Sequence, residues 1–243
     1  MNRGQRIAVV NPNTTESMTV AVLASASAVT RLSTELVGIT ARHGVSTVES
    51  HTDEVTAALG VLDAVERAEA TDRPPDAYVI ACFGDTGLPA AREAAAGPVV
   101  GMTEAALATA TLVAHRFTVI TMPRRTLEQS DRVVRALGLE HRCTVRAIDE
   151  PVSEVADGAR HLLEAFVKEG RRAKMHEASE AIILGCAGLA DLVVPLGERL
   201  GIPVIEGVAA AVVLAEGLVA QGLSTSRAGT WARSGQWTPR ERA

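Results

Sequence analysis

Short apolar runs alternate with longer segments rich in Ala, Leu, Glu and Arg, and this alternation predicts strands and helices along the chain. The run at 76–82 is apolar at nearly every position, which is typical of a strand buried on both faces. We expect eight such strands, at 6–11, 33–40, 76–82, 98–101, 117–121, 143–148, 181–185 and 203–205.

Helices are expected between these strands and after the last of them. Their ranges are 14–28, 51–70, a short helix from residue 88, 103–114, 126–137, 152–169, 189–200 and 208–221. Strands that are apolar on both faces and separated by helices predict an α/β fold, with mainly parallel sheets covered by helices.

The chain also repeats its own pattern. The run that ends at Cys82 is echoed by the run that ends at Cys186, and each is followed by a glycine and a leucine. Pro98 and Pro203 then open two further matching strands at almost the same offset. This repetition predicts two pseudo-symmetric lobes with a cleft between them.

Composition excludes several classes of protein. The 243 residues carry 24 Lys and Arg against 29 Asp and Glu, without a basic block, and only 2% are aromatic. We therefore expect no nucleic-acid partner. No apolar run approaches the ~18 residues of a membrane span, and no signal-peptide core is present. With three cysteines, an odd count, these features indicate a reduced, cytoplasmic protein with no membrane partner.

The familiar cofactor and metal motifs are absent. There is no dinucleotide or phosphate-loop glycine pattern, and the six histidines are scattered. We expect neither a cofactor nor a metal.

The cysteines carry the clearest chemical signal. Cys82 and Cys186 each end a predicted core strand, at the sheet edge where ligands bind in open α/β folds. A following helix N-terminus is expected to lower the thiol pKa toward neutrality. Two thiols across a cleft suit the removal of a proton from one face of a carbon acid and its return to the other. Alternatively both are small buried apolar residues, which is our interpretation of the unmatched Cys143.

Backbone N–H groups beside the two cysteines are candidate donors to an enolate oxygen. Asn13, in the loop after the first strand, has two interpretations: its amide is a ligand donor, or it caps the next helix. Thr121 is its counterpart in the second half. The expected substrate-binding residues are Asn13, Phe83, Gly84, Asp85, Thr121, Ala187 and Gly188.

Several neighbouring residues have more than one interpretation. Asp85 is most simply a helix N-cap. Glu206 either polarises Cys186 or stabilises the start of the last helix. Arg124 and Arg125 resemble an anion clamp but fit an exposed turn, and the loop 41–50 is a candidate cleft wall.

Six stretches together resemble the aspartate/glutamate/hydantoin racemase superfamily, and its hydantoin racemase branch in particular. Thr86 stands where that family more often has Pro, and Leu189 where it often has Met; we expect neither to touch the thiols. The stretches are 10–14, 81–88, 99–105, 115–121, 184–189 and 202–210.

This resemblance implies racemisation without a cofactor by Cys82 and Cys186. It also implies a discontinuous first lobe, 1–100 plus 207–243, that carries Cys82, and a second lobe, 101–206, that carries Cys186. The implied substrates are small molecules, 5-substituted hydantoins inverted at C5, and we expect a homo-oligomer. A related decarboxylase branch keeps only one of the two cysteines, so the pair favours a racemase.

Three alternatives remain open from the sequence. An allantoin racemase differs only in the C5 substituent that its pocket accepts. An amino-acid racemase requires clamps for a carboxylate, for which Arg124 and Arg125 are weak candidates. A non-catalytic two-lobed binding protein has no need of two reactive thiols.

Overall fold

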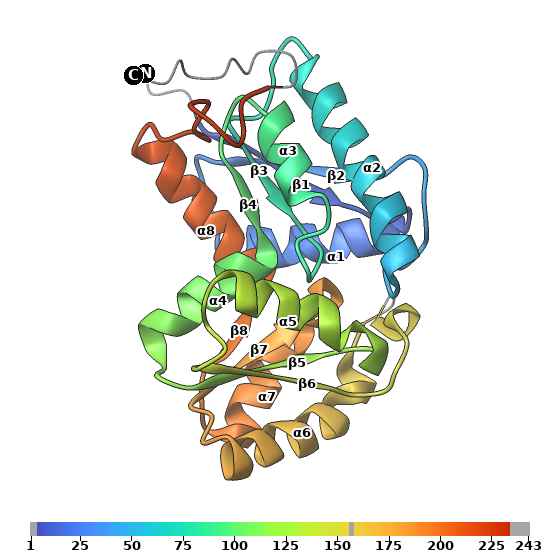
Figure 1. Ribbon diagram of the computed structural model, residues 1–243, viewed down its shortest axis with the longest axis vertical. Coiled ribbons are helices and arrows are strands. Elements are labelled where there is room, and N and C mark those ends of the chain that lie inside the picture. Colours follow the sequence, from blue (N-terminus) through green and yellow to red (C-terminus); the bar gives the residue numbers. More distant parts are fainter. Residues whose placement is uncertain (1–3, 156–157, 234–243) are drawn as a thin grey trace, which may run out of the picture.

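The computed structural model describes residues 4–155 and 158–233, in which eight strands form two four-stranded parallel sheets (Figure 1). The first sheet has the order β2-β1-β3-β4 and the second β6-β5-β7-β8, so both use the same order of strands along the chain. The expected two-lobed α/β fold is confirmed. The strands are β1 (Arg6–Asn11), β2 (Glu35–Thr40), β3 (Ala77–Ile80), β4 (Val99–Gly101), β5 (Phe117–Thr121), β6 (Cys143–Ala147), β7 (Ala181–Gly185) and β8 (Val204–Glu206).

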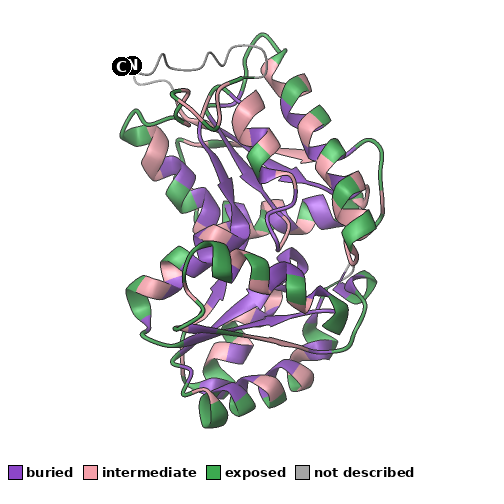
Figure 2. Cartoon of the chain, in the orientation of Figure 1, coloured by how far each residue is buried: buried purple, intermediate pink, exposed green. Residues whose placement is uncertain are grey.

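The central strands are buried on both faces, as their apolar runs predict. Ile7, Ala8, Val9 and Val10 of β1 are fully buried although their side chains alternate between the two faces of the sheet. Figure 2 shows the buried strands enclosed by helices whose outer faces are exposed. Burial on both faces requires a helical layer on each side of each sheet.

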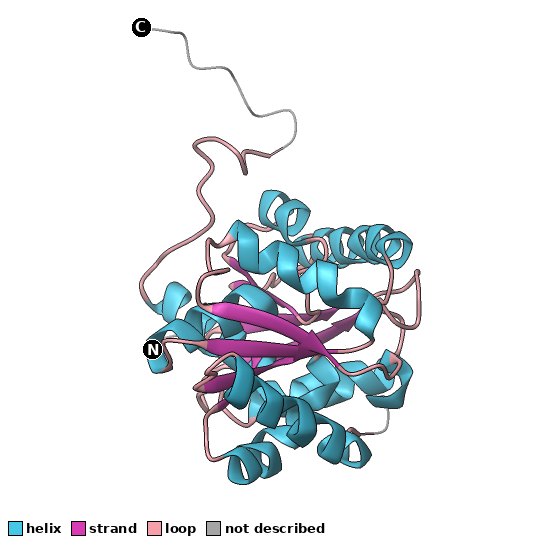
Figure 3. Ribbon diagram, turned by 60° about the horizontal axis from the view of Figure 1, so that its bottom comes forward, coloured by secondary structure: helices cyan, strands magenta, loops and turns pink. Residues whose placement is uncertain are grey.

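Helices supply these layers (Figure 3). In the first lobe α1 and α8 pack on one face of the sheet and α2 and α3 on the other. In the second lobe α6 and α7 cover one face, and α4 and α5 the other. The helices are α1 (Glu16–Ser27), α2 (His51–Glu69), α3 (Leu88–Ala94), α4 (Met102–Val113), α5 (Leu127–Ala136), α6 (Leu163–His176), α7 (Val193–Leu200) and α8 (Gly207–Ala220).

The lobes exchange a helix at each of two crossings of the chain. Helix α4 follows β4 of the first sheet, yet its Leu107 packs in the core of the second. Helix α8 follows β8 of the second sheet, yet its Val208 and Val212 pack in the core of the first. We propose lobe boundaries near residues 100 and 206 on this basis; 1–3 and 234–243 of the proposed first lobe lie outside the described residues.

Two expected helices begin later than their sequence pattern predicts. In the range 152–169, of which 156–157 lie outside the described residues, two 3-10 turns precede α6, and Gly158 between them has φ 105°, which is outside the helical region. The range 189–200 begins with the 3-10 helix η4 (Ala187–Leu192), and α7 starts only at Val193. Pro195 lies in the first turn of α7, where its missing N–H and its ring are tolerated. Among the described residues no helix is both long and apolar enough to cross a membrane.

Candidate active site

Cys82 and Cys186 lie at equivalent places in the two lobes. Cys82 comes just after β3, the third strand in the order of the first sheet, and Cys186 directly after β7, the third strand in the order of the second. Because all strands of a parallel sheet run the same way, both cysteines lie at carboxyl-end edges. Cys82 is half-buried and Cys186 is buried.

Both cysteines line one small cavity of about 40 Å³ between the lobes. That volume accommodates roughly three water molecules, so the cleft is closed around its thiols. The lining residues are Asn13, Met18, Val48, Ala81, Cys82, Phe83, Thr121, Met122, Thr126, Gln129, Ser130, Val152, Gly185, Cys186 and Ala187.

The cavity lining is uncharged. No Lys, Arg, His, Asp or Glu contributes to it among the described residues, and its apolar part comes from both lobes, from Met18 and Val48 to Met122 and Val152. A wall without charged side chains favours a neutral ligand, because a charged one would lose its hydration without gaining a counter-charge. In the part of the chain described, no group of three or more His, Cys, Asp or Glu side chains can hold a metal ion.

The thiols have raised pKa values. Burial raises the pKa of Cys82 to about 12 and that of Cys186 to about 11. Backbone N–H groups at Gly188 and Ala187 lower the pKa of Cys186, but desolvation outweighs them. The expected net lowering by helix N-termini is therefore wrong for the closed cleft, because the facing lobe removes the water that would solvate a thiolate.

Thr86 touches a thiol, contrary to expectation. Its side chain is buried, and its Oγ1 donates a hydrogen bond of 3.5 Å to Sγ of Cys82. This hydrogen bond lowers the pKa of Cys82, against the larger effect of burial. The other departure, Leu189, is a buried core residue in the same apolar cluster as Cys186.

Asn13 stabilises the turn before α1 and also lines the cavity, but it is not the N-cap residue of that helix as one of its two interpretations expected. Its Oδ1 accepts hydrogen bonds from the Thr15 N–H at 2.9 Å and from Nδ2 of Asn11 at 3.0 Å. These contacts order the turn before α1, for which Thr15 is the N-cap residue. The Nδ2 group of Asn13 has no hydrogen-bond partner within the described chain, so it is free to donate to a ligand in the cavity.

The structure brings four of the seven expected binding residues to the cavity: Asn13, Phe83, Thr121 and Ala187. The other three, Gly84, Asp85 and Gly188, do not line the cavity. The Gly84 N–H donates to Oγ1 of Thr103 at 2.8 Å, which occupies the group that was expected to face an enolate.

Asp85 caps a helix, but not the one that follows it. Its carboxylate accepts hydrogen bonds from the N–H groups of Thr103 at 2.8 Å and Glu104 at 2.9 Å, at the start of α4. Its own backbone has φ 53°, which turns the chain back toward that helix. Burial raises the pKa of Asp85 to about 7 despite these two donors.

Glu206 has the second of its two anticipated roles. Its carboxylate accepts hydrogen bonds from the N–H groups of Val208 at 2.7 Å and Ala209 at 2.9 Å, which caps α8. Ser25 of α1 donates to the same carboxylate. The charge of Glu206 raises the pKa of Cys186, so it opposes formation of the thiolate.

Contacts between the lobes close the cleft at its rim. Glu49, in the loop before α2, accepts a hydrogen bond of 3.0 Å from the Val152 N–H of the second lobe. Glu54 of α2 forms an ion pair with Arg132 of α5. The loop 41–50 thus contributes a cleft wall through Val48, whereas Arg124 and Arg125 are exposed and do not line the cavity.

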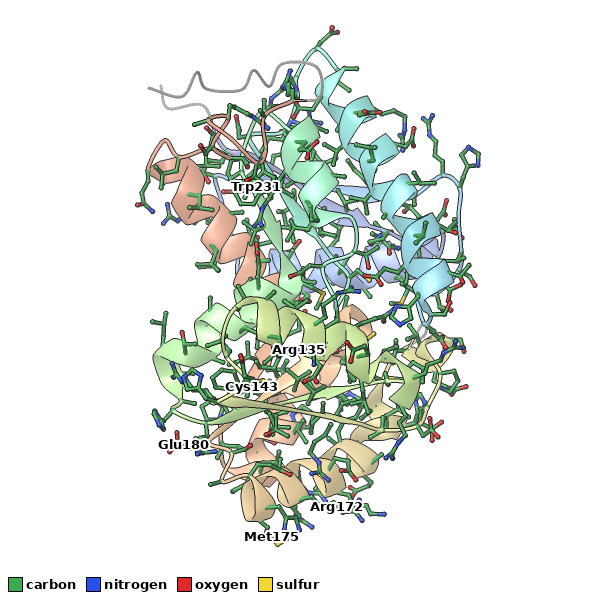
Figure 4. All side chains as sticks on the ribbon, viewed as in Figure 1. Arg135, Cys143, Arg172, Met175, Glu180 and Trp231 are labelled. Atoms are coloured by element: carbon green, nitrogen blue, oxygen red, sulfur yellow. The ribbon has the colours of Figure 1, made fainter. Side chains whose placement is uncertain are left out.

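Sequence reasoning missed the contribution of α5 and its preceding turn. Thr126, Gln129 and Ser130 are buried and line the cavity. The sequence does contain one signal for this contribution. Gln129 and Ser130 lie on the same buried side of α5 as Val134, at positions where apolar residues are usual. Cys143 begins β6 in the second sheet and does not line the cavity (Figure 4). This position agrees with the interpretation of Cys143 as a structural residue.

Comparison with known proteins gives a consistent result. Residues 7–215 match the family model described as Asp/Glu/Hydantoin racemase. A hydantoin racemase of Rhizobium meliloti is 40% identical over 227 residues, which cover 93% of each chain. A solved allantoin racemase from Klebsiella pneumoniae superposes with a TM-score of 0.89 at 41% identity, covering 98% of this chain and 95% of that one. The allantoin racemase of Pseudomonas fluorescens has the same TM-score at 38% identity and covers 98% and 99%.

Proposed function

The chain belongs to the Asp/Glu/hydantoin racemase family, and from that premise we propose that it is a racemase which inverts C5 of 5-substituted hydantoins. Cys82 and Cys186 exchange protons with the two faces of that carbon, and no cofactor takes part. The observation that carries the proposal is the pair of thiols, on equivalent strands of two lobes, lining one uncharged cavity.

In this mechanism one cysteine acts as a thiolate base and the other as a thiol acid. The thiolate removes the C5 proton from one face, and the opposite thiol gives a proton to the other face of the planar enolate. The two pKa values, about 12 and about 11, are close, which suits a reaction that runs in both directions. A raised pKa makes each thiolate scarcer but a stronger base.

The cavity favours a neutral ring over an amino acid. A zwitterionic amino acid needs a cationic clamp for its carboxylate, and the described lining holds none. A hydantoin carries amide groups and no permanent charge. The apolar side chains of Val48, Met122 and Val152 provide a surface for its C5 substituent.

Allantoin is the second candidate substrate, because the two solved allantoin racemases are as similar to this chain as the hydantoin racemase is. Allantoin is itself a hydantoin, with a ureido group at C5. Polarimetry with 5-alkyl hydantoins, 5-benzylhydantoin and allantoin separates the two candidates. A two-lobed binding protein would racemise none of them.

The two-thiol assignment is tested by removing one thiol at a time. We expect Cys82→Ser and Cys186→Ser each to lose racemisation, because serine is too weak a base to replace a thiolate. Each variant should still exchange the C5 hydrogen of one enantiomer in D₂O with retention, and the two should choose opposite enantiomers. Proton NMR of each pure enantiomer, corrected for spontaneous exchange, measures this.

Cys143→Ser is the matched control and should behave as the wild-type protein, since Cys143 does not line the cavity. Substantial racemisation by either single variant, or exchange of the same enantiomer by both, would rule out the two-thiol mechanism.

A further inference from the structure

Helix α5 brings a polar side chain of the second lobe to the thiol cavity. Gln129 is 6% exposed and lines the cavity with both cysteines. It lies opposite the turn that follows Cys82, since a Cβ placed on Gly84 would be 3.6 Å from the Gln129 Cβ. Its amide makes no hydrogen bond within the described chain, and neither amide atom is among the fully buried polar atoms that lack a partner, so the amide is accessible from the cavity.

The other polar groups of the lining are partly used within the protein. Thr121 Oγ1 donates to the Gly185 carbonyl at 3.1 Å, Thr126 Oγ1 to that of Pro123 at 2.8 Å, and Ser130 Oγ to that of Thr126 at 3.5 Å.

Asn13 already accepts two hydrogen bonds at its Oδ1. The hydroxyls therefore keep only acceptor capacity, and Asn13 keeps only a donor. Apart from the two thiols, Gln129 is the side chain of the described lining that keeps both a free donor and a free acceptor.

A primary amide presents an N–H and a C=O side by side. A ligand can pair with both groups at once if its own N–H and C=O point in the same direction. A cis amide in a five-membered ring has this arrangement. An open-chain carbamoyl amino acid lacks this fixed arrangement and carries a carboxylate, for which the lining has no cation.

We infer that Gln129 is a specificity-determining residue, which recognises one amide edge of the substrate ring through a pair of hydrogen bonds. The inference rests on the proposed function for its choice of ligand. It adds to that function a ring-recognition contact on the second lobe, on a helix that carries neither cysteine.

Binding tests the inference without turnover. Calorimetry with unsubstituted hydantoin, 1-methylhydantoin and 3-methylhydantoin should show that one of the two methylations weakens binding to the wild-type protein about 10- to 100-fold, the effect of losing one or two buried hydrogen bonds. Gln129→Met keeps the length of the side chain and removes both hydrogen-bonding groups. It should bind hydantoin more weakly by a similar factor and should bind the two methyl derivatives within about threefold of each other.

Glu128→Gln is the matched control, because Glu128 is the exposed neighbour of Gln129 on α5 and pairs with Arg135. It should bind all three compounds as the wild-type protein does. The wild-type comparison does not depend on whether the Met variant folds.

The inference is overturned if the wild-type protein binds none of the three compounds or binds all three equally. It is also overturned if a folded Gln129→Met variant keeps the wild-type preference. Racemisation of a 5-substituted hydantoin, measured separately, shows whether the proposed function fails on its own. Binding that depends on Gln129 in a protein that inverts no hydantoin would refute the racemase and leave ring recognition standing.

Discussion

At the scale of single residues, the hydrogen bond from Thr86 to Cys82 allows the effect of one side-chain donor on a thiol pKa to be measured. The hydroxyl donates to Sγ at 3.5 Å in a buried environment, where a thiolate has little other stabilisation. Cys186 relies instead on backbone N–H groups of the following turn. The two thiols are thus supported by different donors, and the side-chain donor can be removed alone.

Thr86→Val should raise the pKa of Cys82 further, by about half to one pH unit, because a hydrogen bond to the thiolate is lost. Between pH 7 and 9 the rate of alkylation of Cys82 by iodoacetamide should fall about three- to tenfold, since thiolate is the reactive form. Cys186 should keep its rate. Mass spectrometry of the two cysteine peptides measures both rates in one sample.

Thr86→Ser retains the hydroxyl and should restore most of the Cys82 rate. Equal rates in the Val variant and the wild-type protein would show that the hydroxyl has no influence on the thiol. A parallel fall at both cysteines would indicate a general change in access instead.

At the scale of elements, Asp85 joins the turn after β3 to the start of α4. Burial raises its pKa from 3.8 to about 7 in the folded protein. A raised folded-state pKa means that the folded protein binds this proton more tightly than the unfolded chain does. The contribution of Asp85 to stability is therefore fully present below about pH 4 and is lost as the pH rises to about 7.

Asp85→Asn should remove that part of the pH dependence, because the amide does not titrate. The upper bound of the effect is about 4 kcal/mol, for a shift of about three pH units. At low pH, where Asp85 is protonated, the variant should be less stable than the wild-type protein by about 1 kcal/mol, because the carboxyl hydroxyl oxygen can still accept from a backbone N–H and the amide NH₂ group cannot. Urea unfolding at pH 4, 5.5 and 7 measures both effects. An identical slope in the two proteins would contradict the assignment to Asp85.

The sequence predicted the strands well because each parallel strand is buried on both faces and is apolar at nearly every position. It also predicted the equivalent placement of Cys82 and Cys186, since the repeat carries each cysteine to the same strand edge. It did not predict that Asp85 caps α4, because that contact depends on a backbone with φ 53° at Asp85 and spans 18 residues.

The contribution of α5 and the raised thiol pKa values were missed for a related reason. Gln129 reaches the cavity only because the second lobe packs against the first. The same packing removes water from both thiols, so their pKa values depend on a contact between lobes that no local motif encodes.

At the scale of the whole molecule, the cavity of about 40 Å³ between the lobes is small for a substituted ring, and we expect the lobes to separate when substrate enters. The ion pair between Glu54 and Arg132 is one of the contacts that hold the rim together. It is partly exposed, and such pairs contribute about 0–1 kcal/mol. Loss of this ion pair should therefore increase the population of the open form by only a small factor.

Glu54→Gln should raise the alkylation rates of Cys82 and Cys186 together, about two- to fivefold, because opening exposes both thiols. Removal of the Glu54 charge alone would accelerate only Cys82, whose pKa that charge raises. Asp63→Asn, which breaks an ion pair within α2, is the control and should change neither rate. Unchanged rates at both cysteines in Glu54→Gln would show that this pair does not hold the cleft closed.

The return of α8 to the first sheet also determines the order in which the chain can fold as it is synthesised. When the ribosome has made β4, the face of the first sheet that includes Ile7 and Val9 still lacks the helix that supplies Val208 and Val212 to its core. At about 5–20 residues per second, that helix follows roughly 6–24 s later. The first lobe to be translated is thus the last to be completed, and one face of its sheet stays only half covered until α8 has been made.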